Sequence, residues 1–82
     1  MRIDKFLSIV GILKRRNQAQ EMLKSNLIFI NSIPSKPSKE VKIGDVIEIQ
    51  YVDYVRKLIV LNLPLSKSIP KSSRDLYFKE LK

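Results

Sequence analysis

Three consecutive cations, Lys14, Arg15 and Arg16, are the residues of this sequence whose type and spacing best suit a binding chemistry. A guanidinium group holds several N–H donors in a fixed fork, which matches the two oxygens of a phosphate. The triplet stands directly before a predicted helix, whose first backbone N–H groups also favour a phosphate. The pattern indicates recognition of a polyanion; the alternative is a basic turn that only keeps the protein in solution.

Further candidate contacts lie at the start of the chain and in a loop. Arg2 and Lys5 fall on the first turn of a predicted helix, where cations oppose the helix dipole and therefore need another role. That role is either a phosphate contact or an ion pair with a nearby acid. Asp4 is expected to hold an arginine fork in position or to accept a bond from a base or ribose hydroxyl, unless it only stabilises the helix N-terminus. Gln18 is a candidate to contact a base edge or a sugar. Lys36 lies in a Pro-flanked loop and is a candidate to contact a phosphate. For both residues the alternative is that the side chain is only exposed to solvent.

The overall charge supports a polyanionic partner. Sixteen Lys and Arg stand against eight Asp and Glu, which gives a net charge of +8 in 82 residues. A domain this basic suits nucleic acid first and an anionic membrane second. The sequence has neither Cys nor His, so a disulfide scaffold, a thiolate nucleophile, a Cys-based zinc site and histidine acid–base chemistry are excluded. We therefore expect no catalytic residue, no metal and no cofactor.

The elements that must position these side chains follow from the spacing of apolar residues. Apolar residues at three-and-four spacing predict a helix over residues 3–13. A second helix is predicted over residues 18–25, with Asn17 as its N-cap and Gln20 completing a capping box. Asn26 is expected to end this helix in the left-handed conformation.

Beyond residue 26 the pattern changes to one typical of strands. Strands are predicted over residues 27–30, 46–52 and 56–62, with the isoleucines of the second one facing inward. A turn is expected at residues 31–32, where Asn-Ser should favour a different turn type from Asn-Gly. Residues 74–82 are expected to form a short helix after a basic, Ser- and Pro-containing linker.

These elements predict an α+β fold, with a two-helix hairpin packed on a small, mostly antiparallel sheet. We expect one domain over residues 1–63 and an extension over residues 64–82, which holds the basic linker and the short C-terminal helix. A chain of this length has a small core and little room for a deep substrate cavity. No apolar run approaches the ~20 residues of a spanning helix, and no secretory leader is evident, so a cytoplasmic location is expected.

Four motifs, in order and at matching spacing, resemble one known family. They are Arg2–Leu7, Arg15–Ala19, Ile28–Asn31, and the segment from Lys36 to Ile47 with its Lys-Pro-Ser and Gly-Asp pieces. They resemble the S-four domain, an RNA-binding domain named for ribosomal small-subunit protein four, over roughly residues 2 to 52. The polyanion is thereby identified as RNA. The RNA-binding residues that we predict from charge and position are Arg2, Asp4, Lys5, Lys14, Arg15, Arg16, Gln18 and Lys36.

Short, free-standing members of this family, the small bacterial ribosome-quality-control factors, are the most similar. The resemblance implies a protein that binds ribosomal RNA of the large subunit and the peptidyl-tRNA of a stalled complex. It also implies support for nascent-chain tailing beside a tRNA-recruiting protein. The alternatives are a heat-shock-type S-four protein that rescues free large subunits carrying nascent chains, and a general binder of structured RNA. A monomer is expected.

Three other classes of protein are weaker interpretations. An enzyme lacks support because no pair of carboxylates is singled out by spacing and the two Gly form no phosphate-binding loop. A membrane-surface protein is disfavoured because the strands need the apolar stripe of the first helix as a core partner. A DNA-binding helix-turn-helix is disfavoured by the order of the RNA-binding motifs.

Overall fold

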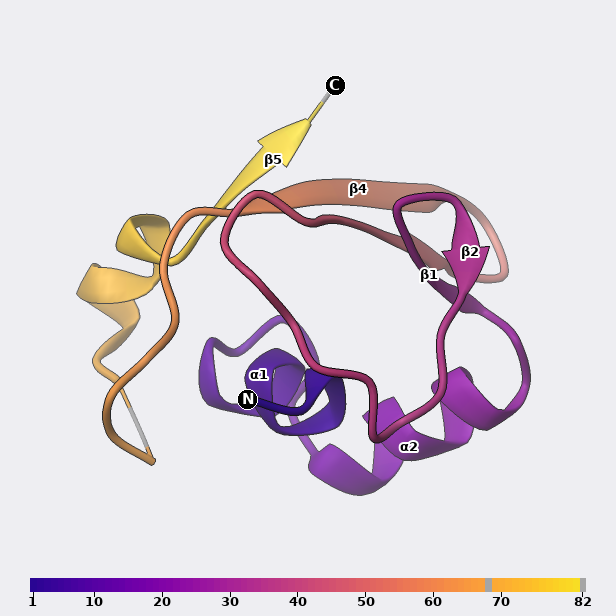
Figure 1. Cartoon of the computed structure of the whole chain (residues 1–82), viewed down its shortest axis with the longest axis horizontal. Helices are drawn as coiled ribbons and strands as arrows, with labels where there is room; N and C mark the ends of the chain where they lie inside the picture. Colours follow the sequence, from indigo (N-terminus) through magenta and orange to yellow (C-terminus); the bar gives the residue numbers. More distant parts are fainter. Residues whose placement is uncertain (68, 82) are drawn as a thin grey trace.

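Two helices lie against one face of a five-stranded antiparallel sheet in the computed structural model, which describes residues 1–67 and 69–81 (Figure 1). The helices are α1 (Ile3–Ile9) and α2 (Arg16–Lys24). The strands are arranged in the order β2-β1-β3-β4-β5, and their bounds are β1 (Ile28–Ile30), β2 (Ile33–Pro34), β3 (Val46–Gln50), β4 (Val55–Val60) and β5 (Phe78–Leu81). The predicted α+β fold is confirmed.

Helix α1 supplies one side of the core. Ile3, Phe6, Leu7 and Val10 are fully buried, as their three-and-four spacing predicts. The helix ends at Ile9 rather than continuing to residue 13. The reason is local, because Gly11 adopts a φ of 77°, a left-handed conformation that interrupts the helix and turns the chain toward α2.

Helix α2 begins earlier than predicted, and the predicted cap is wrong. Arg15 is the N-cap residue and makes no side-chain cap bond, while Asn17 lies inside the helix. The predicted capping box is also absent from this described segment, since the Gln20 amide donates instead to Asp4 of α1. The early start is explained by a tertiary ion pair, because the same Asp4 carboxylate lies 3.3 Å from Nε of Arg16.

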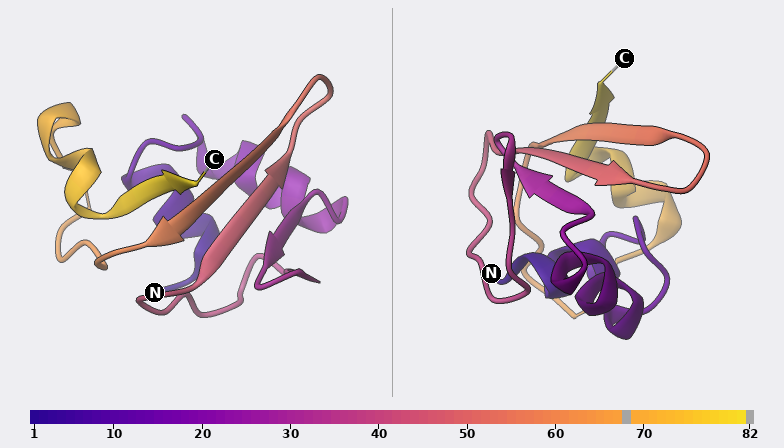
Figure 2. Two further views of the ribbon diagram at one scale, coloured as in Figure 1. Left: turned by 90° about the horizontal axis from the view of Figure 1, so that it is seen from above. Right: turned by 90° about the vertical axis from the view of Figure 1, so that its right-hand side faces the viewer.

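The opposite side of the core comes from the alternating residues of the sheet. In the β1–β3 pair, Ile28 is opposite Ile49 and Ile30 is opposite Ile47. All four side chains are buried, so the predicted inward orientation of the β3 isoleucines is confirmed. These side chains meet α1 and α2 between the two layers seen in Figure 2.

The two-residue turn between β1 and β2 differs from the sequence prediction. Asn31 and Ser32 have φ values of 50° and 71°, which is the pattern of the turn that Asn-Gly favours, although a different type was expected. The Asn31 side chain explains this, because it accepts from Val46 N–H at 2.9 Å and donates to Asp45 at 3.1 Å. Asn26 ends α2 with a φ of 60°, as predicted.

The C-terminal segment is a strand where a helix was predicted. A short 3₁₀ helix, η1 (Lys71–Leu76), leads into β5, which pairs antiparallel with β4. The predicted helix over residues 74–82 is therefore wrong for Phe78–Leu81, which form β5, whereas residues 74–76 lie in the 3₁₀ helix. Residue 82 lies outside the described residues. A nine-residue helix is marginal alone, whereas the edge of β4 offers unpaired backbone groups to a strand. The predicted division of the chain after residue 63 stays a prediction.

The loop between β2 and β3 runs from the sheet to the helices and fixes the start of the chain (Figure 1). The Ile3 N–H donates to the Lys39 carbonyl at 2.8 Å, and the Val41 N–H donates to the Met1 carbonyl at 2.9 Å. The Met1 amino group also binds Glu40 at 2.6 Å. The first turn of α1 is thereby held in place beside α2.

Candidate nucleic-acid interface

A buried carboxylate lies at the centre of the candidate interface. The side chain of Asp4 has 0% exposed surface. Its Oδ2 accepts from the guanidinium of Arg2 and from the amide of Gln20, both at 3.0 Å, and lies 3.3 Å from Nε of Arg16. Its Oδ1 accepts from the Lys5 backbone N–H at 2.8 Å. We call Asp4, Arg2, Arg16 and Gln20 the Asp4 cluster.

The surroundings of Asp4 keep it ionised. Burial opposes the charged form, but hydrogen bonds from Gln20 and Arg16 and from the Lys5 N–H outweigh it, so the pKa of Asp4 lies below its ordinary value of 3.8. A buried charge without partners would be strongly destabilising. Asp4 is therefore a fixed anion that orders the groups around it.

The two arginines of the cluster are anchored on one side and open on the other. Their side chains remain 44% and 43% exposed for Arg2 and Arg16, respectively. Asp4 engages one terminal nitrogen of Arg2 and Nε of Arg16, so the remaining N–H groups of each fork stay available for an external acceptor. The expectation that Asp4 holds an arginine fork in position is confirmed, and it holds two.

A basic turn lies next to the Asp4 cluster, formed by Lys14 and Arg15. Both side chains are exposed, and neither makes an ion pair with an acid of residues 1–67 or 69–81. Gln18 is also exposed, on the first turn of α2. Because Arg15 makes no side-chain cap bond, the N-terminus of α2 beside the basic turn has no cap from its own N-cap side chain. The turn and the uncapped helix form a region that favours anions.

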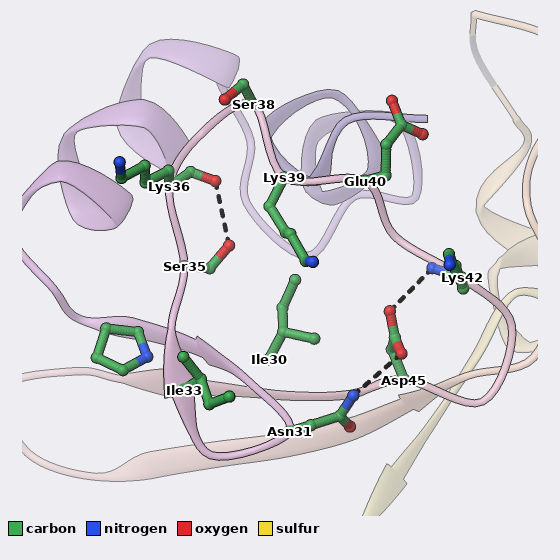
Figure 3. A pocket seen from close by; sticks show the side chains of 11 residues that line it. Ile30, Asn31, Ile33, Ser35, Lys36, Ser38, Lys39, Glu40, Lys42 and Asp45 are labelled. Atoms are coloured by element: carbon green, nitrogen blue, oxygen red, sulfur yellow. Dashed lines mark hydrogen bonds between the residues drawn. The ribbon is translucent and has the colours of Figure 1, made fainter.

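Lys36 belongs to the loop between β2 and β3, where the carbonyl of the next residue, Pro37, accepts from the Asp4 backbone N–H at 3.4 Å. Lys36 lines a hollow of about 520 Å³ between the β1–β2 turn and the loop that precedes β3, together with Lys39 and Lys42 (Figure 3). The apolar side chains of Ile30 and Ile33 also line the hollow. Of the predicted residues, the structure thus brings Arg2, Asp4, Lys5 and Arg16 together. Lys14, Arg15 and Gln18 are exposed on the turn before α2 and on its first turn, and Lys36 lines the hollow beside the β1–β2 turn.

Gln20 is the residue of the cluster that sequence reasoning missed. Its spacing from Asn17 predicts a capping residue, but its amide donates to the buried Asp4. Gln20 follows Arg16 by four residues, so the two share one face of α2. That spacing was a signal that both side chains point toward the same partner.

Within residues 1–67 and 69–81, no helix has both the length and the apolar character needed to cross a membrane. Over the same described ranges, no group of three or more Asp and Glu gathers into a possible metal site.

Comparisons with known proteins place the chain in a family. A sequence model of the S4 domain matches residues 1–47. A Helicobacter pylori (strain J99) protein named "RQC P-site tRNA stabilizing factor" is 43% identical over 77 residues, covering 94% of this chain and 92% of that protein.

Solved structures agree with this placement. The solution structure of a hypothetical protein, HP1423, is 38% identical with a TM-score of 0.86, and the match covers 100% of this chain and 98% of that one. The structure of Vibrio cholerae Heat Shock Protein 15 has a TM-score of 0.87 at 24% identity, covers 99% of this chain and 81% of that one, and shows the shared fold. The chain therefore belongs to the S4 domain family, among the relatives named RQC P-site tRNA stabilizing factor.

Proposed function

We propose that this protein is a non-catalytic, cytoplasmic RNA-binding factor of stalled-ribosome quality control. In this proposal it binds ribosomal RNA of the large subunit and peptidyl-tRNA, and so supports the tailing of trapped nascent chains. It works as a monomer beside a tRNA-recruiting protein. The family relationship supports this proposal, because relatives 35% to 43% identical carry the name "RQC P-site tRNA stabilizing factor".

The single observation that carries the proposal is the buried Asp4 carboxylate with two half-exposed arginines. Removing a carboxylate from water costs free energy, so a chain that only needed solubility would gain nothing from it. The arrangement fixes two guanidinium forks in advance, and less conformational entropy is lost when they bind a phosphate or a base edge. Pre-ordered arginines fit recognition of a folded RNA better than nonspecific attraction.

The proposed mechanism divides the work between two groups of cations. Lys14 and Arg15 attract the phosphate backbone and contribute affinity that depends on salt. Arg2 and Arg16 set the register of the protein on the RNA, with Lys5 and Gln18 as flanking contacts. Lys36 contacts a phosphate from the loop that lies beside the start of α1. RNA is then recognised through its shape and charge, with no covalent step.

A heat-shock-type role on free large subunits carrying nascent chains is the second candidate function. The fold similarity to Heat Shock Protein 15, with a TM-score of 0.87, favours it. The 43% identity to the Helicobacter pylori factor over nearly the whole chain favours the first candidate more strongly.

Sedimentation of tagged protein through a sucrose gradient of bacterial lysate tests the proposal. Three chains are compared: wild type, Arg16→Ala and Lys79→Ala. Lys79 is exposed on β5 and its loss changes the net charge equally, so it controls for charge alone. We expect wild type and Lys79→Ala to travel with large subunits that carry peptidyl-tRNA, and Arg16→Ala to remain at the top.

The other outcomes are informative as well. If all three chains remain at the top, the ribosomal target is wrong and free structured RNAs become the candidates. If Arg16→Ala sediments like wild type, the Asp4 cluster is not the binding surface. A measurement of nascent-chain tailing in cells with and without the protein separates the two candidate functions, because only the first candidate includes support of tailing.

A further inference from the structure

A second cation-lined hollow lies beside the Asp4 cluster and uses a residue far along the chain. It has a volume of about 370 Å³ and is lined by Lys5, Ser8, Ile9, Arg16 and Lys67. Lys5, Ser8 and Ile9 come from α1 and Arg16 from α2. Lys67 comes from the linker that follows β4 (Figure 1). Residues 62 positions apart in sequence thus face one space.

All the charged side chains that line the hollow are cations. Its lining residues include three cations, one hydroxyl and one apolar side chain, and none of them is an acid. Lys5 and Lys67 make no side-chain ion pair with any acid that the structure describes. Like charges that converge repel one another, and an anion that enters the hollow removes that cost. Ammonium, guanidinium and hydroxyl donors are together suited to the oxygens of a phosphate.

The linker is anchored on both sides of Lys67. Before it, Pro64 is buried and Leu63 is half-buried against the core. After it, Ile69 also packs against the core. A lysine on a free tail would spend little time in one place. Lys67 lies three residues after the buried Pro64 and two before Ile69, and it lines the same hollow as Lys5 and Arg16.

Contacts of η1 and of Tyr77, the residue after it, hold the start of the same linker. The Leu61 N–H donates to the Tyr77 carbonyl at 2.8 Å, and the Asn62 amide donates to the Leu76 carbonyl at 3.3 Å. The guanidinium of Arg74 packs against Gly11, where an added Cβ would lie 2.3 Å from its Cζ. The C-terminal segment therefore docks on the turn between the helices and fixes the path of the linker.

We propose that this hollow binds a phosphate of the RNA backbone and that Lys67 is an RNA-binding residue. The inference rests on the proposed function and extends its surface beyond the part of the chain that matches the S4 domain. The C-terminal segment then has a binding role: it carries a cation back to the helical face. The phosphate is held by Lys5, Arg16 and Lys67, with the Ser8 hydroxyl as a fourth donor.

Equilibrium binding to purified large ribosomal subunits across a salt series tests the inference. The variant is Lys67→Ala and the matched control is Lys79→Ala, since both lysines are exposed and both changes remove one charge. We expect Lys67→Ala to bind several-fold more weakly, with the slope of log affinity against log salt reduced by about 0.7 to 0.9, the value of one contact. Lys79→Ala should change both quantities by much less, and Lys67→Arg should retain most of the binding.

A second measurement follows the lysines directly. Acetylation of the free protein by an amine-reactive reagent should modify Lys5 and Lys67, and bound large subunits should protect both while leaving Lys79 reactive. The phosphate site is disproved if wild type binds large subunits, Lys67→Ala has the same affinity and salt slope as Lys79→Ala, and Lys67 is not protected from acetylation. The proposed function survives that result. If wild type itself fails to bind large subunits, the proposed function fails first.

Discussion

The Asp4 cluster and the basic turn adjoin each other in sequence, yet they hold their cations in opposite ways. Arg16 is tied to a buried carboxylate at 3.3 Å. Its neighbour Arg15 is exposed and, among the described residues, has no acidic partner. The cluster combines two arginines with one aspartate and so carries a net charge of +1, while Lys14 and Arg15 of the turn carry +2.

The region with less net charge is the one with more order. Side chains of the turn must lose rotamer freedom when they bind, whereas those of the cluster have already lost part of it on folding. Lys14 and Arg15 of the turn therefore attract RNA at long range, whereas the ordered arginines of the cluster fix how the protein is aligned on the RNA. Substitutions in the cluster and in the turn should therefore differ in their effects on stability and on RNA affinity.

Asp4→Asn should have the largest effect. Asparagine keeps the shape but loses the charge that orders Arg2 and Arg16, and its amide presents N–H donors toward them. We expect a loss of about 1 to 3 kcal/mol in the free energy of unfolding. RNA affinity should fall about tenfold or more, which corresponds to at least about 1.4 kcal/mol, although the net charge rises. Urea denaturation and subunit binding measure the two effects.

Asp53→Asn is the control for this substitution. Asp53 is exposed between β3 and β4, so the same change raises the charge equally without touching the cluster. Equal or tighter RNA binding by Asp4→Asn would show that charge alone governs recognition.

A charge-conserving pair of substitutions compares the two neighbours directly. Arg16→Lys removes the Nε that reaches Asp4, whereas Arg15→Lys leaves a charge on an exposed side chain. We expect Arg16→Lys to weaken binding to large subunits about tenfold and Arg15→Lys by less than about threefold, or roughly 1.4 against 0.6 kcal/mol. Similar losses for the two variants would remove the distinction between cluster and turn.

Lys14→Ala tests the contribution of charge at the turn. One phosphate contact fewer should reduce the slope of log affinity against log salt by about 0.7 to 0.9. The loss should be the same for different structured RNAs, because a phosphate contact carries no sequence information. Titrations with large subunits and with an unrelated folded RNA, each over a range of salt, check both statements.

Acid should weaken the cluster in a narrow pH range. The pKa of folded Asp4 lies below its ordinary value of 3.8, so the charged carboxylate contributes stability that is fully present above that value. This stability is lost as the pH falls below 3.8 and through the lower pKa of the folded state. Thermal melts at pH 7 and pH 3 should therefore show a smaller decrease in Tm for Asp4→Asn than for wild type. An equal decrease would assign the acid sensitivity to other carboxylates.

Much of the fold could be predicted from local pattern. The buried face of α1, the inward isoleucines of β3 and the left-handed Asn26 all follow from spacing or from residue type. The boundaries of α2 could not, because Arg16 is drawn into the helix by a residue on another helix. The C-terminal segment was also assigned wrongly, since a strand forms there only because β4 offers a free edge.

The chemistry of this protein follows from its residue types and their order: a cationic surface without His or Cys, two amphipathic helices, and alternating strands that must share a core. Which of the cations are ordered depends instead on how the elements pack. Asp4, Arg16 and Gln20 form one hydrogen-bonded group because two helices pack face to face, and Lys67 reaches that face because the chain returns to it. Periodicity reports which side of an element is buried, whereas a partner on another element depends on how the whole core packs.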